Sequence, residues 1–447
     1  MEGMAETVPL RPDADPTAIE LVAARPHLRY DAMDGLLVED VPLNAVADAL
    51  GTPTWVLSAG ALRGRLAQLQ GALARAGLDA RIHYAVKAND HLAVLRIMAA
   101  GGAGADVVSG GELRRALLAG IAPEAVVFSG VGKTADELRL ALARGVGQIN
   151  AESAEELDML AAAAAATGRT VRVALRVNPD VDAGTHAKIT TGRAEDKFGI
   201  AYGDAPALYA RAASLPGVEP VGLAVHIGSQ VLGTVPFRAA YARVAELVRA
   251  LRAQGNAVGI VDCGGGLGIA YRDEIVPTPD AFAGAIRLTL GDLGVRLAVE
   301  PGRWLAGPAG LLLASVVLAK RTGGRGSTVL DAAMNDLVRP ALYDAWHGIV
   351  PVSAADAAAP GAPTDVVGPV CESGDTFARL RALPRLRANA RVAILDAGAY
   401  GAVMSSTYNA RPLAAQALVD GARWAVIRER QPVEALWADE RVPEWLV

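Results

Sequence analysis

Residues 82–89 read IHYAVKAN, a short apolar run that ends around Lys87. A run of this length between polar residues is typical of a strand buried in a parallel sheet. Lys87 would then stand at the mouth of that strand, where loss of water lowers the pKa of an amine. An amine with a lowered pKa is nucleophilic and can condense with an aldehyde, so this lysine is the first candidate for chemistry.

Around this run, short apolar segments alternate with amphipathic helical segments. Such alternation predicts a parallel sheet, and eight units over about 220 residues fit a closed (β/α)8 barrel of the TIM type. An open doubly wound sheet is the alternative, but it needs a glycine-rich turn after its first strand, where this chain has Lys87. The expected strands are residues 81–86, 104–108, 125–129, 147–150, 171–177, 221–227, 258–262 and 296–300.

After residue 310 the pattern changes to strand-like runs separated by loops rich in Gly and Pro. The expected fold class is therefore α/β, a barrel with a second, mostly β domain. We expect residues 1–50 to form an N-terminal segment that in part joins the β domain, residues 51–310 to form the barrel, and residues 311–447 to form the β domain. The low-complexity segment 351–364 is expected to be a surface loop.

Bulk composition narrows the function classes. The chain has 447 residues, a net charge of −5 and two cysteines. No basic patch indicates nucleic acid or an anionic membrane, and the apolar stretch 309–319 is too short to span a bilayer, which takes about 20 residues. Two cysteines exclude a disulfide framework and fit a reducing cytosol. We expect a cytoplasmic protein without a bound metal.

Unusual polar residues fall where a barrel enzyme places its chemistry, at the carboxyl ends of the expected strands. The first strand ends at Lys87. Random placement would scatter such residues over both ends of the barrel. The strings that follow the fifth, sixth, seventh and eighth strands are RVNP (176–179), HIGSQ (226–230), DCGGGLG (262–268) and EPGR (300–303).

Lys87 and the glycine run after the seventh strand together indicate a phosphorylated aldehyde cofactor, pyridoxal phosphate (PLP). The run, Gly264–Gly266, exposes backbone N–H groups without side chains in the way, and such runs bind phosphate. Glu300 would face the pyridine nitrogen and keep it protonated, so that the ring accepts electrons. His226 would pack flat against the ring and restrain it.

Taken in order, the strings of this chain resemble those of the meso-diaminopimelate decarboxylases, which belong to the fold type III (alanine-racemase-like) PLP enzymes. The resemblance spans roughly residues 50–430, and its motifs are highly specific as a set. One departure is Asp196, where many relatives have Ser. The matching strings are YAVKAN (84–89), HAKITTGRAEDKFGI (186–200), HIGSQ (226–230), GGGLG (264–268), EPGR (300–303), MNDLVRPALY (334–343), CESGD (371–375), GAYG (398–401) and YNARP (408–412).

The resemblance implies how the cofactor is held. Lys87 would bind PLP covalently, His226 would stack on its ring, and Glu300 would pair with the pyridine nitrogen. The glycine run and the backbone of the turn that begins at Glu300 would bind the phosphate. The residues that would bind the cofactor are Lys87, His226, Gly264, Gly265, Gly266, Glu300, Pro301, Gly302, Arg303 and Tyr400.

The resemblance also implies how a small amino-acid substrate is held. Arg303, Arg339 and Tyr343 would bind the carboxylate at its non-reacting end, since a planar guanidinium binds a carboxylate through two parallel hydrogen bonds. Glu372 would bind an ammonium group of the substrate. Tyr400 would touch both cofactor and substrate.

Catalysis would use Lys87, His226 and Glu300 at the cofactor and Cys371 as the proton donor. In this family the residues that match Cys371 and Glu372 reach the site from the other subunit, which implies a homodimer with two shared active sites. The implied activity is that of a carboxy-lyase. It is the PLP-dependent decarboxylation of meso-2,6-diaminopimelate to L-lysine and CO₂, the last step of lysine biosynthesis.

Three other readings share part of this pattern. Fold type III decarboxylases for ornithine or arginine have no distal carboxylate to hold, so Arg339 and Tyr343 disfavour them, whereas a carboxynorspermidine decarboxylase stays open. An amino-acid racemase of this architecture pairs the pyridine nitrogen with arginine, and Glu300 disfavours it. A non-catalytic PLP-binding protein is a single barrel and lacks both the second domain and the string at 371–375.

Overall fold

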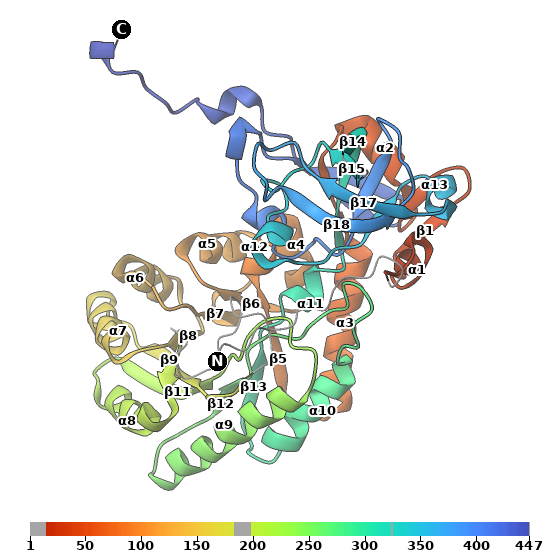
Figure 1. The fold of residues 1–447 in the computed structure, drawn as a ribbon. Helices are drawn as coiled ribbons and strands as arrows, with labels where there is room; N and C mark the ends of the chain where they lie inside the picture. The colour runs from red at the N-terminus through yellow and green to blue at the C-terminus, as the bar shows by residue number, and fades with distance from the viewer. Residues whose placement is uncertain (1–14, 183–197, 323–324, 447) are drawn as a thin grey trace, which may run out of the picture. The chain divides into compact units, whose positions relative to one another are not determined.

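The structure, a computed structural model, describes residues 15–182, 198–322 and 325–446 and divides the chain into two compact units (Figure 1). Unit 1 is Met1–Gly60, Tyr271–Asp273 and Pro308–Val447, and unit 2 is Ala61–Ala270 and Glu274–Gly307. The stretch 186–197, which contributes to the family resemblance and contains Asp196, lies outside the described residues.

Unit 2 contains a closed barrel of eight parallel strands, because β13 pairs with β5 and β8 pairs with β9. This confirms the predicted (β/α)8 barrel and excludes the open doubly wound sheet. A short strand, β10 (Ile200–Ala201), adds to the edge of β9. The barrel strands are β5 (Ala80–Ala85), β6 (Gly104–Val107), β7 (Val126–Phe128), β8 (Gln148–Ala151), β9 (Val171–Asn178), β11 (Val218–Ala224), β12 (Ile260–Asp262) and β13 (Arg296–Val299).

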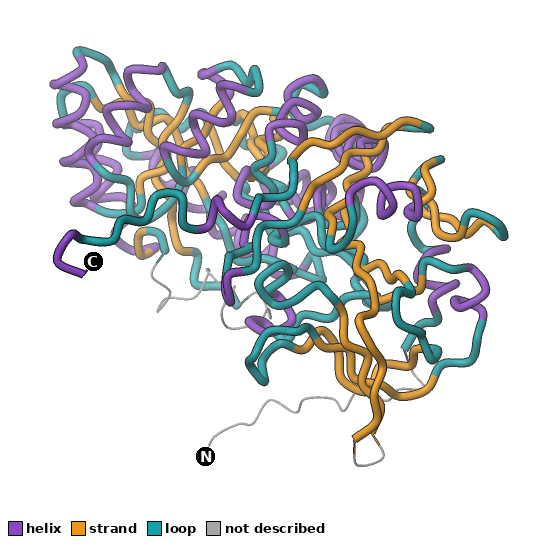
Figure 2. The backbone as a smooth tube through the Cα atoms, turned by 90° about the horizontal axis from the view of Figure 1, so that it is seen from above, coloured by secondary structure: helices purple, strands orange, loops and turns teal. Residues whose placement is uncertain are grey.

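Helices connect these strands and lie on their outer side, as Figure 2 shows. The helix before the first barrel strand, α3, buries leucines that recur at helical spacing on one face, namely Leu62, Leu66, Leu69 and Leu73. The helices are α3 (Ala59–Arg75), α4 (Leu92–Ala100), α5 (Gly110–Leu118), α6 (Ala135–Arg144), α7 (Ala154–Thr167), α8 (Ala205–Ser214), α9 (Val235–Ala253) and α10 (Pro279–Leu290).

Helix α6 shows how local sequence sets these elements. The Thr134 side chain accepts a hydrogen bond from the Glu137 N–H at 3.2 Å, and the Glu137 carboxylate accepts one from the Thr134 N–H at 2.9 Å. This capping box satisfies two N–H groups that the first turn leaves without helical partners. The helix buries Leu138 on its inner face and ends before Gly145, whose φ of 76° is left-handed.

Unit 1 is built on one large mixed sheet in which β14 (Gly310–Thr322) is central. Successive side chains of a strand point to opposite faces. Leu311 and Leu313 accordingly pack into one core with Leu36 and Val46, whereas Leu312 packs into a second core on the other face. The other strands of this sheet are β4 (Thr54–Ser58), β15 (Arg325–Leu330), β16 (Ile349–Pro351), β17 (Ala362–Val367), β18 (Thr376–Leu383), β19 (Arg391–Ile394), β20 (Ala415–Asp420) and β21 (Arg423–Arg428).

Smaller elements complete the chain. A three-stranded sheet of β1 (Leu28–Asp31), β2 (Gly35–Val38) and β3 (Val41–Pro42) lies in unit 1. No helix of the described ranges has the length and apolar character needed to cross a membrane. The short helices are α1 (Ala18–Ala23), α2 (Leu43–Leu50), α11 (Arg303–Ala306), α12 (Arg339–Tyr343) and α13 (Ala354–Ala358).

The expectation that residues 351–364 form a loop is wrong. Ser353 caps the short helix α13 by accepting a hydrogen bond from Asp356, and β17 begins at Ala362. An alanine-rich stretch forms helix readily once a cap is present, and low sequence complexity did not reveal this.

Candidate active site

A cavity of about 420 Å³ opens at the carboxyl ends of the barrel strands, and its volume suits a small-molecule site. Its wall takes residues from the ends of most barrel strands, so the closed barrel brings together positions far apart in the sequence. The polar residues in the wall are Lys87, Ser129, Asn150, Arg176, His226 and Glu300. Three of the predicted catalytic residues thus line one cavity.

Lys87 lies in a single 3-10 turn, Val86–Ala88, directly after β5. Its Nζ donates a hydrogen bond to Oδ2 of Asp106 at 2.6 Å, and the Asp106 side chain is fully buried in β6. Among the described residues, the other oxygen of Asp106 has no hydrogen-bond partner. A buried carboxylate therefore holds the amine at the strand mouth. Sequence reasoning missed Asp106, although a carboxylate inside an apolar strand was a usable signal.

Glu300 follows β13 and is buried. Loss of water raises the pKa of its carboxyl well above the usual range, and repulsion from the nearby carboxylates of Asp106 and Asp262 raises it further. The charge of Lys87 opposes this shift. Ser129 donates a weak hydrogen bond to Glu300 at 3.4 Å. The Glu300 carboxyl therefore binds a proton more readily than an ordinary glutamate does, and it can share that proton with a basic group in the cavity.

His226 lies just after β11, and its Nδ1 accepts a hydrogen bond from the N–H of Gly265 at 3.1 Å. Burial lowers the pKa of the imidazole well below its usual value, and the charges of Arg176 and Lys87 lower it further. The ring is therefore neutral, with its proton on Nε2. A neutral ring fixed by this bond can lie against a flat aromatic ligand.

The glycine run is packed against neighbouring backbone. A Cβ at Gly264 would lie 2.2 Å from the Val225 carbonyl oxygen, and a Cβ at Gly266 would lie 2.4 Å from that of Gly228. Gly266 also has a φ of +103°, which other residues rarely adopt. Close packing and backbone conformation, rather than a plain turn, therefore require glycine here.

The prediction that all three residues of the run Gly264–Gly266 offer free N–H groups is wrong in part. The N–H of Gly264 donates to Asp262 at 3.0 Å, and that of Gly265 donates to His226. In the described part of the chain, only Gly266 of these three has no partner for its N–H. The first two glycines therefore orient neighbouring side chains, and the third remains available to an anion.

The turn after β13 approaches the end of β5 closely. A Cβ at Gly302 would lie 2.9 Å from the Cβ of Ala88, and the Ala85 N–H donates to the Pro301 carbonyl at 3.2 Å. Buried Arg303 donates from Nε and Nη2 to the Ser229 hydroxyl at 3.3 and 3.1 Å. This contact links the loops after β11 and β13. Ser229 was not predicted to take part.

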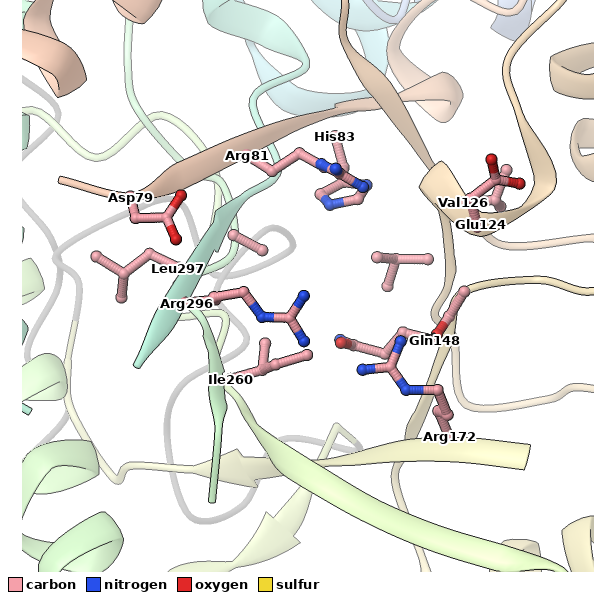
Figure 3. Close-up of a pocket in the computed structure, with 13 residues that line it drawn as sticks. Asp79, Arg81, His83, Glu124, Val126, Gln148, Arg172, Ile260, Arg296 and Leu297 are labelled. Atoms are coloured by element: carbon pink, nitrogen blue, oxygen red, sulfur yellow. Dashed lines mark hydrogen bonds between the residues drawn. The ribbon is translucent and has the colours of Figure 1, made fainter. Parts of the chain in front are cut away.

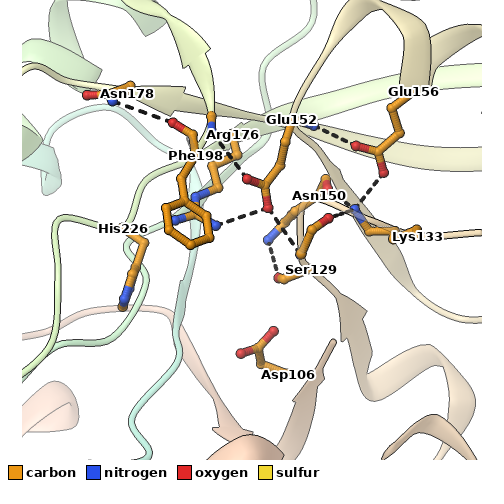
Figure 4. A network of polar contacts seen from close by, with 12 residues as sticks. Asp106, Ser129, Lys133, Asn150, Glu152, Glu156, Arg176, Asn178, Phe198 and His226 are labelled. Atoms are coloured by element: carbon orange, nitrogen blue, oxygen red, sulfur yellow. Dashed lines mark hydrogen bonds and ion pairs between the residues drawn. The ribbon is translucent and has the colours of Figure 1, made fainter. Parts of the chain in front are cut away.

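A chain of buried ion pairs supports the wall of the cavity (Figure 4). Glu152 accepts hydrogen bonds from Arg176 at 3.0 Å and from the Gly199 N–H at 3.2 Å. One carboxylate oxygen of Glu156 accepts a hydrogen bond from the Glu152 N–H at 2.8 Å, and the other accepts one from the Lys133 amine at 2.5 Å. The network joins the ends of β7, β8 and β9 and fixes Arg176 at the cavity.

Replacing Lys133 with alanine should lower the free energy of unfolding by about 3–5 kcal/mol, because it leaves the buried Glu156 without its cation. The Lys133 side chain is fully buried. Urea denaturation measures the change. Arg139→Ala is the matched control, since Arg139 and Asp136 form an exposed pair, and its removal should change stability by less than about 1 kcal/mol. Equal effects of the two substitutions would contradict a role for the buried pair.

The remaining predicted residues lie in unit 1. Arg339 is buried in α12 and Tyr343 lies one turn further along that helix. Cys371 and Glu372 are exposed in the loop between β17 and β18, and the Cys371 N–H donates to Asn409 at 3.3 Å. A fifth predicted residue, Tyr400, has a left-handed φ of 55°, which is unusual for a residue with a side chain.

A second, smaller cavity of about 130 Å³ lies at the opposite, amino end of the barrel strands (Figure 3). Arg81, Arg172 and Arg296 point into it, and Asp79 and Glu124 also line it. None of the predicted site residues is in its wall. Because barrel enzymes place their chemistry at the carboxyl ends of the strands, the larger cavity is the candidate active site.

Comparison with known proteins agrees with this assignment. Residues 60–307 match the family model of the pyridoxal-dependent decarboxylases, in its pyridoxal-binding domain. A diaminopimelate decarboxylase of Zymomonas mobilis is 49% identical over 92% of this chain and 98% of its own length. One of Pseudomonas aeruginosa is 47% identical over 91% of this chain and 96% of its own length.

Solved structures give the same result. The diaminopimelate decarboxylase of Helicobacter pylori complexed with L-lysine has a TM-score of 0.85 and 36% identity, and the alignment covers 89% of this chain and 98% of that one. The diaminopimelate decarboxylase of M. jannaschii, also in complex with L-lysine, has a TM-score of 0.89 and 34% identity. The alignment covers 95% of this chain and 99% of that one. The chain therefore belongs to the pyridoxal-dependent decarboxylases and, within that family, to the diaminopimelate decarboxylases.

Proposed function

We propose that this protein is a carboxy-lyase that removes one carboxyl group of meso-2,6-diaminopimelate as CO₂ and leaves L-lysine, the last step of lysine biosynthesis. One observation carries the chemistry: an amine, Lys87, and a buried carboxyl, Glu300, whose pKa is raised by burial, line the same cavity at the carboxyl ends of the barrel strands. The names of the close relatives support the choice of substrate.

The residues of the cavity fit pyridoxal phosphate, the cofactor of the family. The Lys87 amine suits its aldehyde, the Glu300 carboxyl suits its pyridine nitrogen, and the N–H of Gly266 suits its phosphate. A Cβ at Gly266 or Gly302 would crowd the surrounding backbone and side chains. When bound, the cofactor supplies an electron sink for the bond to Cα that breaks.

Each residue then has a definite task. Lys87, oriented by Asp106, would hold the cofactor at its aldehyde carbon. Glu300 would pair with the pyridine nitrogen, and His226 would stack on the ring. Gly266 and the backbone of the turn at Pro301, Gly302 and Arg303 bind the phosphate, and Tyr400 touches cofactor and substrate.

The substrate carries an amino acid at each end, so one end must be bound while the other reacts. We assign the distal carboxylate to Arg339, Arg303 and Tyr343, because a guanidinium binds a carboxylate through two hydrogen bonds. Glu372 takes the distal ammonium group. Cys371 gives a proton to Cα after CO₂ has left.

A substrate survey of the purified enzyme with PLP tests the proposed function. We expect CO₂ release from meso-diaminopimelate with L-lysine as the amino-acid product, and little release from ornithine or arginine, which lack a distal carboxylate. Carboxynorspermidine is also tested, because the residue types of the site do not exclude it as the substrate. Faster turnover of carboxynorspermidine than of diaminopimelate would overturn the assignment.

We also propose a homodimer in which each active site takes Cys371 and Glu372 from the other subunit. Both residues are exposed in the single chain, where a proton donor for a water-excluding site is out of place. The free thiols of Cys263 and Cys371 fit a cytoplasmic location, which is part of the proposal.

Mixing two inactive variants, Lys87→Ala and Cys371→Ala, tests the shared site. A mixed dimer has one site with both residues intact, so random exchange of subunits should restore about a quarter of the wild-type activity. Activity is followed as CO₂ release, and subunit exchange is confirmed with differently tagged chains. Proven exchange without recovered activity would mean that each chain supplies its own Cys371.

A further inference from the structure

Arg339, the proposed carboxylate-binding residue, is held by a buried histidine. His347 is 1% exposed, its Nε2 lies 2.9 Å from Nη1 of Arg339, and its Nδ1 lies 2.8 Å from the Leu395 carbonyl oxygen. A carbonyl oxygen only accepts, so Nδ1 carries the proton and Nε2 accepts from the guanidinium. These two bonds fix a neutral histidine in one tautomer.

An aromatic ring packs against the same guanidinium. The guanidinium carbon of Arg339 lies 4.9 Å from the centre of the Tyr271 ring, within reach of a cation–π interaction. Tyr271 also meets the His347 ring edge to face, with centres 5.2 Å apart and planes at 77°. The guanidinium is thus held by a hydrogen bond and by a ring, and it is buried.

The backbone of His347 is held as well. Its carbonyl oxygen accepts a hydrogen bond from Arg381 at 2.8 Å. The buried Arg381 pairs with Asp15 at 3.3 Å, and Asp15 also pairs with Arg272 at 3.0 Å. These contacts anchor the backbone of the histidine independently of Arg339.

We propose that His347 is a positioning residue that holds Arg339 in the orientation in which it binds the distal carboxylate of the substrate. This inference rests on the proposed function. A neutral acceptor suits the task, because it orients one N–H of the guanidinium and leaves the positive charge for the substrate. A carboxylate at this position would compete with the substrate for that charge. His347 thereby favours substrates that carry a distal carboxylate.

Two substitutions separate positioning from general support. The amide of His347→Asn reaches the place of Nδ1 and can still donate to Leu395, but it loses the acceptor for Arg339. The amide of His347→Gln reaches the place of Nε2 and keeps that acceptor. We expect the Asn variant to raise KM for diaminopimelate about tenfold with kcat nearly unchanged, and the Gln variant to stay close to wild type.

Binding without turnover provides an independent readout. Calorimetric titration of the holoenzyme with L-lysine, which keeps the distal carboxylate, should show about tenfold weaker binding in the Asn variant. Cadaverine has the same two amines and no carboxylate, so its affinity should not change. Arg339→Ala serves as the reference for complete loss of the guanidinium, and thermal melting confirms that each variant folds.

The outcomes distinguish this inference from the proposed function. If the wild type fails to release CO₂ from diaminopimelate, the function is wrong, whereas the lysine and cadaverine titrations still test the positioning role. If the Asn variant binds lysine and cadaverine more weakly by the same factor, His347 only supports the fold. The same conclusion follows if the Gln variant is as impaired as the Asn variant. Unchanged lysine affinity in the Asn variant overturns the inference directly.

Discussion

Replacing Lys87 with alanine abolishes the visible absorption of the bound cofactor and lowers CO₂ release from diaminopimelate by more than about 10³-fold. The reason is that Lys87 is the amine in the cavity wall, where it lies 2.6 Å from the buried carboxylate of Asp106. Among the described residues, Lys133 cannot replace it, since its side chain is fully buried in its pair with Glu156. An absorption spectrum and a CO₂ assay on the same preparation measure both effects.

The matched control is Lys320→Ala. Lys320 lies in β14 of unit 1 and is exposed, so its removal should leave spectrum and turnover as in the wild type. If the Lys87→Ala protein kept the absorption band of the wild type, Lys87 would not be the residue that holds the cofactor.

Replacing Glu300 with glutamine should lower kcat by more than about 10²-fold while the cofactor stays bound. Glutamine fills the same space but cannot transfer a proton to the pyridine nitrogen or carry the charge that keeps it protonated. Burial and the nearby carboxylates raise the pKa of the Glu300 carboxyl, so the native residue binds a proton more readily than an ordinary glutamate does. Steady-state kinetics, with cofactor content measured after denaturation, separate turnover from binding.

Glu124→Gln is the control for this substitution, since Glu124 lines the small cavity at the amino end of the barrel strands. It should leave kcat unchanged. Wild-type kcat in Glu300→Gln would show that the ring nitrogen has another partner.

Much of the fold follows from the sequence because the barrel strands are short apolar runs at regular intervals. The run that ends at Lys87 is the clearest of these, and β5 covers residues 80–85. Elements with mixed patterns escape such reasoning. β18 carries two arginines in eight residues, and the second, Arg381, is buried and pairs with Asp15. Burial by ion pairing leaves no apolar pattern to recognise.

The site was predictable where residue type and position coincide. Lys87, His226 and Glu300 stand at strand ends, and the barrel brings them to one cavity. Hydrogen-bond partners were not predictable, because they depend on which loops meet across the barrel. The N–H groups of Gly264 and Gly265 are taken by side chains of the same site, which a run of glycines cannot reveal.

The hydrogen-bond partners of Arg339 were likewise not predictable from the sequence. His347 lies eight residues further along the chain, and its bond to Arg339 depends on the Leu395 carbonyl of a distant strand end. Neither the spacing nor the residue types announce this arrangement. The arrangement forms only when the large mixed sheet of unit 1 folds and brings these segments together.

The most direct test of the central claim, that Lys87 holds the cofactor in the barrel cavity, is to reduce the PLP-loaded enzyme with borohydride and locate the attached group by peptide mass spectrometry. We predict a single pyridoxyl-bearing peptide, the one that contains Lys87. Attachment at Lys133, Lys320 or any other lysine, with Lys87 unlabelled, would contradict the assignment of the active site.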